Sequence, residues 1–81
     1  MTENAEEYMT GYEIAKEVNK RLEGLSMKLI PTQMVYNYMK QPTRLRKLVI
    51  AMKDGKKLVK RSDAMTWIES YVNGRIEREK A

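Results

Sequence analysis

The stretch that decides the fold is Pro31-Thr32-Gln33-Met34-Val35-Tyr36-Asn37-Tyr38-Met39-Lys40. It predicts a short helix with two unlike faces, because Val35, Tyr38 and Met39 recur at helical spacing and would form the inner side. The other side contains no carboxylate, and its residues can hydrogen-bond or stack: Thr32, Gln33, Tyr36, Asn37 and Lys40. Such a face is either the solvated side of an ordinary amphipathic helix or a surface suited to a nucleic-acid groove.

The distribution of charge along the chain favours the second interpretation. The 81 residues carry a formal net charge of +5. Residues 1–24 have a net charge of −3, residues 25–61 one of +9, and residues 62–81 one of −1. A basic block of this size attracts polyanions and speeds their encounter with the protein. A merely solubilising surface is the alternative explanation.

Several classes of function are disfavoured by the composition. The chain has neither His nor Cys, which removes imidazole general bases, thiol nucleophiles, disulfides and most zinc sites. We therefore expect no enzyme, no metal, no cofactor and no small-molecule substrate. No apolar run approaches the ~20 residues of a membrane helix, and the acidic N-terminus lacks the order of a signal peptide. We expect a cytoplasmic, nucleoid-associated protein without membrane contact.

A supporting helix is predicted to begin at Thr10, after a flexible acidic arm of residues 1–9. Thr10 and Glu13 have the spacing of a capping box, in which each side chain accepts a hydrogen bond from the other residue's backbone. Met9 and Ile14 occupy the positions of a hydrophobic staple around that cap. The sequence therefore specifies both the start of this helix and the angle at which the chain enters it.

The connection to the second helix is long and apolar. Gly24 is expected to end the first helix, residues 25–30 to pack against the protein, and Pro31 to fix the entry to the second helix. Pro42 disfavours helical backbone at the preceding residue, so the second helix should end there. The two helices are a helix-turn-helix candidate with a longer turn than the tightest form of that motif.

A basic β-hairpin is predicted next. Residues 47–52 and 57–61 have the composition of strands, and the intervening Asp54-Gly55 is a strong signal for a two-residue hairpin turn. The predicted tip carries Lys53, Lys56 and Lys57. Such lysines either protect a sheet edge from aggregation or contact phosphates.

A third helix is predicted from Ser62, which has the chemistry of an N-cap. Trp67 shares a helical face with Ile68 and Tyr71, so it is expected to fill the core rather than to bind a ligand. Gly74 is expected to end both this helix and a domain of residues 10–74. Residues 75–81 are a charged tail that either extends the helix or frays.

In this order the elements resemble the excisionase-like and MerR-like group of small winged-helix DNA-binding domains. The resemblance is carried by Thr10-Gly11-Tyr12-Glu13-Ile14-Ala15, Val35-Tyr36-Asn37-Tyr38-Met39-Lys40, Asp54-Gly55-Lys56-Lys57-Leu58-Val59-Lys60-Arg61 and Ser62-Asp63-Ala64-Met65-Thr66-Trp67-Ile68. It covers roughly residues 9–73. It implies a mainly α fold with a small β-hairpin, in the winged order helix-turn-helix-hairpin-helix.

Two departures from the family pattern bear on this resemblance. The turn between the first two helices is long, and Gln41-Pro42-Thr43 stands where the family often has a Lys-Gly turn. The long dimerisation helix and effector domain of full MerR regulators are also missing. The resemblance is therefore to the excisionase-like branch of small phage- or plasmid-type proteins, which act in DNA recombination or transcription regulation.

The resemblance implies that the second helix enters the major groove and that the hairpin reaches the neighbouring minor groove or the backbone. Gln33 and Asn37 carry the amide donor and acceptor that can grip adenine. Thr32 and Tyr36 can donate to phosphate or touch a thymine methyl group. The basic residues expected on the DNA backbone are Lys28, Lys40, Arg44, Arg46, Lys53, Lys56 and Lys57.

The expected function is sequence-specific binding of double-stranded DNA by a small non-catalytic regulatory or architectural protein. Its further partners would be an integrase, or copies of itself assembled cooperatively on DNA. An alternative is a winged-helix module that binds a protein as an inhibitor or antirepressor. Met27 and Met34 could supply the apolar patch that it needs. RNA binding is disfavoured because the chain has no Phe and its few Tyr predict no stacking sheet.

Overall fold

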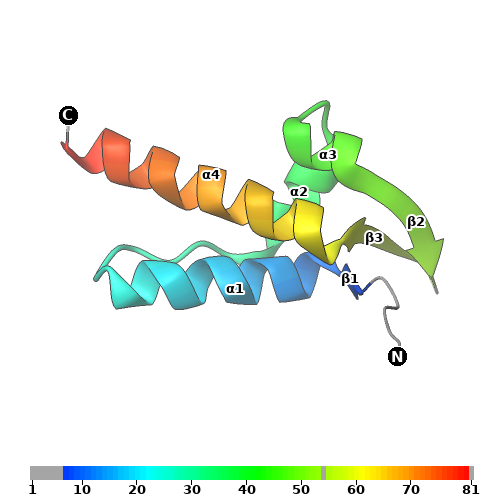
Figure 1. Cartoon of the computed structure of the whole chain (residues 1–81), viewed down its shortest axis with the longest axis horizontal. Helices are drawn as coiled ribbons and strands as arrows, with labels where there is room; N and C mark the ends of the chain where they lie inside the picture. The colour runs from blue at the N-terminus through cyan, green and yellow to red at the C-terminus, as the bar shows by residue number, and fades with distance from the viewer. Residues whose placement is uncertain (1–6, 54, 81) are drawn as a thin grey trace.

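Four helices and a three-stranded antiparallel sheet make up the residues that the computed structural model describes, 7–53 and 55–80 (Figure 1). In chain order they are β1 (Tyr8–Met9), α1 (Gly11–Gly24), α2 (Thr32–Lys40), α3 (Arg44–Leu48), β2 (Val49–Lys53), β3 (Lys56–Lys60) and α4 (Arg61–Lys80). The expected class, mainly α with a small β-hairpin, is confirmed.

Helix α1 begins at the cap that the sequence predicts. The Thr10 hydroxyl oxygen accepts a hydrogen bond from the Glu13 backbone N–H at 3.3 Å, and Glu13 Oε1 accepts one from the Thr10 N–H at 2.9 Å. Met9 and Ile14, the two staple positions, are both buried in the core. The helix ends at Gly24, as predicted.

The connection between α1 and α2 is held by one side chain of α1. Asn19 Nδ2 donates to the Ile30 carbonyl at 2.9 Å, and its Oδ1 accepts from the Ile30 N–H at 2.8 Å. The Ile30 side chain is buried in the core. Because both backbone groups of Ile30 are tied to α1 just before Pro31, this contact fixes where α2 starts.

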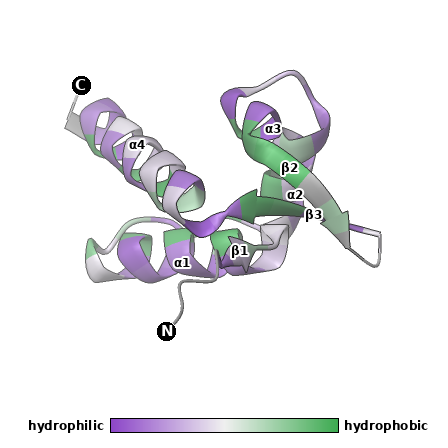
Figure 2. Cartoon of the chain, turned by 45° about the vertical axis from the view of Figure 1, so that its right-hand side comes forward, coloured by the Kyte–Doolittle hydropathy of each residue, from purple (hydrophilic) through white to green (hydrophobic). Residues whose placement is uncertain are grey.

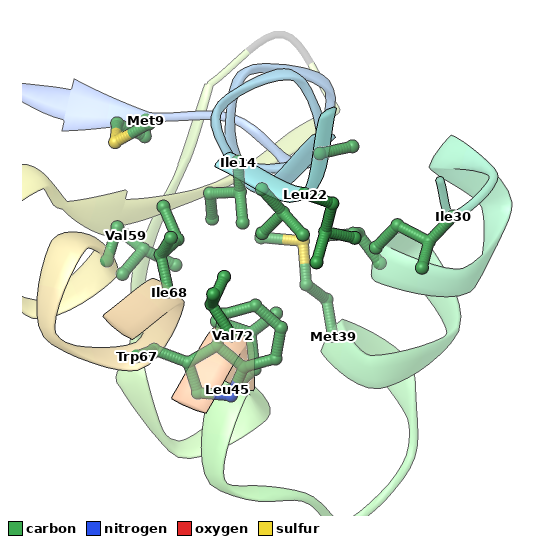
Figure 3. Packing of buried hydrophobic residues seen from close by; sticks show 14 residues of the cluster. Met9, Ile14, Leu22, Ile30, Met39, Leu45, Val59, Trp67, Ile68 and Val72 are labelled. Carbon is green, nitrogen blue, oxygen red and sulfur yellow. The ribbon is translucent and has the colours of Figure 1, made fainter. Parts of the chain in front are cut away.

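The core lies where α1, α2 and α4 meet, and residues of α3 and the sheet complete it (Figure 3). Val35 and Met39 of α2 are buried, and Tyr38 is half-buried, so the predicted inner side of α2 is correct. Trp67 is 8% exposed and stacks on Tyr71, with ring centroids 5.3 Å apart and planes at 18°. The prediction that Trp67 fills the core is confirmed.

Helix α3 is an element that the sequence prediction missed. The predicted strand from residue 47 was wrong at its start, because Arg44–Leu48 are helical and β2 begins only at Val49. The Thr43 hydroxyl oxygen caps this helix by accepting from the Arg46 N–H at 3.3 Å, and it also donates to the Tyr38 carbonyl. Leu45 is completely buried, so burial of one leucine adds to the cap in stabilising a short helix.

The predicted hairpin is present, and a third strand extends it to a sheet with the order β1-β3-β2. Its closing pair is Lys53↔Lys56, and Gly55 has a φ of 77°, a left-handed conformation that glycine adopts without strain. Asp54 lies outside the described residues. A loose arm was predicted over residues 1–9. This prediction was wrong for the last two residues, because Tyr8 and Met9 pair with β3. Residues 1–6 lie outside the described residues.

Helix α4 is longer than predicted. It begins at Arg61, one residue before the predicted cap Ser62, and runs to Lys80. Gly74 therefore does not end it, and the interpretation in which the tail extends the helix is the correct one. A glycine inside a helix costs roughly 1 kcal/mol relative to alanine, and the packing of Ile76 against the core offsets this cost. In the described part of the chain, no helix has the length and apolar composition to cross a membrane.

Candidate functional site

A groove with a volume of about 260 Å³ lies between the first turn of α1, the outer face of α2 and the tip of the hairpin. We call it the lysine groove, and its lining residues are Thr10, Gly11, Gln33, Tyr36, Met39, Lys40, Gly55, Lys56 and Lys57. Among these described residues, every charged one is a lysine. The fold thus brings together side chains that the sequence predicted separately, on the second helix and on the hairpin: Gln33, Tyr36, Lys40, Lys56 and Lys57.

The shape of the lysine groove depends on Gly11. A β-carbon at this position would lie 2.5 Å from Tyr36 Cε1 and 3.1 Å from Met39 Sδ. The Tyr36 ring therefore lies directly on the backbone of α1, although 37% of the residue remains exposed. Tyr36 is held against the protein and leaves only part of its surface accessible to a ligand.

The two amide side chains of α2 bind each other. Gln33 Nε2 donates to Asn37 Oδ1 at 3.1 Å, across one turn of the helix, and both residues are exposed. This bond uses one donor of Gln33 and the acceptor of Asn37. The Gln33 carbonyl oxygen and the Asn37 N–H donors take no part in this bond, and an acceptor and a donor are the two groups that the major-groove edge of adenine requires.

The lysine groove is suited to an anion. Lys56 and Lys57 come from the hairpin, which extends away from the helices (Figure 2), and Lys40 comes from the last turn of α2. A lysine ammonium group is a compact charge with three donors on a flexible stem, so it can follow a phosphate without demanding one geometry. Three such groups beside an acid-free helix face favour a polyanion over a single small acid.

The other predicted contact residues lie outside the groove. Asn37 lies next to it through its bond to Gln33, and Thr32 is half-buried at the start of α2. Arg44 and Arg46 are exposed on α3. Lys28 lies in the connection that starts at the end of α1 opposite the hairpin (Figure 1). The side chain of Lys53 lies outside the described residues.

The sequence prediction missed two charged residues near α2. Burial raises the pKa of the Tyr38 hydroxyl above its usual value, and Tyr71 raises that pKa further, whereas the positive charges of Arg78 and Arg75 partly lower it. The two arginines of α4 therefore lie close enough to α2 to act on one of its side chains. The pattern Tyr71, Arg75, Arg78, with helical spacing, was the available signal, and it was lost because the helix was predicted to end at Gly74.

The sequence prediction also missed the roles of Gly11 and Asn19, which carry no charge and position α2. An asparagine inside a helix is a poor helix former, which could have indicated a tertiary hydrogen bond. No family model matches the chain, and the comparisons with curated proteins and with solved structures also found no match. The functional assignment therefore depends on the geometry of the lysine groove and of the outer face of α2.

Proposed function

We propose that this chain is a winged helix-turn-helix protein that binds double-stranded DNA sequence-specifically and without catalysis. In this proposal α1 and α2 are the helix-turn-helix pair, α2 enters the major groove, and the β2–β3 hairpin is the wing. Its setting would be the cytoplasm, as a regulatory or architectural protein of the excisionase type. The observation that carries the proposal is the lysine groove, where lysines of two elements meet beside an acid-free helix face.

Physical dimensions support this arrangement. The major groove of B-DNA is about 12 Å wide and admits one α-helix. The outer face of α2 presents the Gln33–Asn37 amide pair for base edges. Lys40, Lys56 and Lys57 line the groove beside that helix, and in this proposal they would neutralise backbone phosphates. Phosphate contacts would supply most of the affinity and fix the register, and the amide pair would supply sequence preference.

A salt titration of binding to a random-sequence duplex tests the proposal. We expect binding at low salt that weakens steeply as salt increases, because each neutralised phosphate releases counterions. The double variant Lys56→Gln/Lys57→Gln should reduce the slope of log K against log[salt] by about one unit per lost contact. The control Lys16→Gln/Lys20→Gln removes the same charge from the exposed side of α1 next to Arg61, and it should leave the slope nearly unchanged.

A protein-interaction module is the second proposal, and it rests on different residues from those first considered. Met27 and Met34 are partly buried against the core, so they do not form the exposed patch that this function needs. Ile50 and Met52 do stand exposed, on the edge strand β2. Absence of DNA binding at low salt would refute the first proposal and favour this one.

A further inference from the structure

A second group of basic residues lies away from the lysine groove, beyond the N-terminal end of α2. Arg75 Nη2 of α4 donates to the backbone carbonyl of Lys28 at 3.3 Å. Lys28 precedes α2 by only a few residues, and both Lys28 and Arg78 are exposed. We call Lys28, Arg75 and Arg78 the arginine cluster.

The packing of α4 on α2 determines where the arginines of this cluster lie relative to α2. The Tyr71 hydroxyl lies 3.6 Å from Met34 Sδ, and its ring centroid is 6.2 Å from that of Tyr38. Arg75 and Arg78 follow Tyr71 at the i+4 and i+7 positions, so they continue the same face of α4. Glu77, at i+6 from Tyr71, lies off this face, whereas Glu79, at i+4 from Arg75, lies at its edge.

The lysine groove and Tyr71 of α4, from which the arginine cluster continues, lie on opposite flanks of the outer face of α2. At about 100° per residue, Tyr36 and Met34 stand on either side of the ridge formed by Gln33 and Asn37. The Tyr36 flank faces Gly11 and the lysine groove, whereas the Met34 flank faces Tyr71 of α4. In Figure 1 the end of α4 and the hairpin also lie at opposite ends of the molecule.

We propose that the arginine cluster is a second phosphate-binding site, which contacts the DNA strand across the major groove from the strand held by the lysine groove. This inference rests on the proposed DNA-binding function. A helix in the major groove lies between two phosphate backbones, and phosphate contacts set its register and orientation. Basic groups on both flanks of α2 would fix its tilt in the groove, whereas the lysine groove alone would hold one side.

The double variant Lys28→Gln/Arg78→Gln tests this site. It removes two charges and keeps the hydrogen bond from Arg75, which uses only the backbone of Lys28. We expect the slope of log K against log[salt] to fall by roughly two units. The control Lys16→Gln/Lys20→Gln has the same net charge as Lys28→Gln/Arg78→Gln. Its slope of log K against log[salt] should stay near that of the unmodified chain. Thermal unfolding of each variant shows whether it is folded.

Phosphate ethylation interference on a duplex selected from a random pool gives the second readout. We expect two groups of interfering phosphates, one on each strand, and the Lys28→Gln/Arg78→Gln variant should lose the group on one strand only. The salt slope and the interference pattern of this variant could both stay unchanged while the slope of Lys56→Gln/Lys57→Gln falls. That result would overturn the phosphate-binding role of the arginine cluster and leave the proposed function intact. Absence of DNA binding by the unmodified chain would overturn both.

Discussion

The ring of Tyr36 lies on the backbone of Gly11, so close that no side chain fits between them. Gly11 is the first residue of α1 and Tyr36 is in the middle of α2. This contact therefore holds α2 against the start of α1 and gives the lysine groove one of its walls. A residue without a side chain thus determines the position of an aromatic ring on the outer side of the molecule.

Gly11→Ala should destabilise the fold. The added methyl group would lie 2.5 Å from Tyr36 Cε1 and 3.1 Å from Met39 Sδ, and overpacking of this kind costs about 1–3 kcal/mol. Urea unfolding measures the change. Gly74→Ala is the matched control, because nothing lies within 4 Å of its β-carbon position and alanine is favoured in a helix by up to about 1 kcal/mol. Equal effects of both variants would contradict the close contact.

Asn19→Ala should loosen the connection before α2. It removes two hydrogen bonds and leaves the N–H and carbonyl of Ile30 without their partner, which costs about 1–3 kcal/mol for a buried group. Asn73→Ala, an exposed change on α4, should stay within about 0.5 kcal/mol of the unmodified chain. Chemical denaturation of the two variants provides the comparison. If Asn19→Ala were as stable as Asn73→Ala, the two hydrogen bonds from Asn19 to Ile30 would not contribute to stability.

Asn37→Ala should reduce sequence discrimination. Asn37 supplies the donor of the amide pair and orients Gln33 through their hydrogen bond, and loss of a bidentate base contact costs about 1–3 kcal/mol of discrimination at one base pair. The measurement compares binding to a selected duplex and to its single-base variants. Equal weakening on selected and random duplexes would refute a base-reading role.

The free energy of unfolding should fall at alkaline pH, and ionisation of the Tyr38 hydroxyl should account for part of that fall. Burial, with a further contribution from Tyr71, raises the pKa of its hydroxyl, so above about pH 10 the unfolded chain loses a proton that the folded protein keeps. The contribution of Tyr38 is fully present below that pH and is lost as the pH rises through the folded pKa. Tyr38→Phe should show a shallower loss of unfolding free energy above pH 10, and identical slopes would contradict the assignment.

The parts of the fold that the sequence predicted are those controlled by local chemistry. The cap formed by Thr10 and Glu13, the apolar side of α2 and the turn at Gly55 each depend on residues a few positions apart. Strand β1 depends instead on pairing between Met9 and Val59. A strand of two residues is too short for its own sequence to predict such a distant partner. Helix α3 was missed because its last residues resemble those of strand β2 in composition and were assigned to that strand. The burial of Leu45, which helps to stabilise the helix, depends on tertiary contacts.

The candidate site follows the same division. The face of α2 and the lysines of the hairpin were predictable, because helical spacing and a turn signal place them. Their meeting in one groove was not, since it depends on the docking of Tyr36 on Gly11. The arginines of α4 were missed because Gly74 is a common helix terminator, whereas here the packing of Ile76 carries the helix past it.

The central position of β3 in the sheet has a consequence for how the chain folds. The α1–α2 pair and the β2–β3 hairpin can form from neighbouring segments, but Tyr8 finds its partner Lys60 only after the chain has been synthesised through β3. Closing so long a loop is slow relative to local pairing, so β1 should be the last element to dock. Truncation past Met9 should therefore weaken the base of the hairpin while every residue that lines the lysine groove remains in the chain.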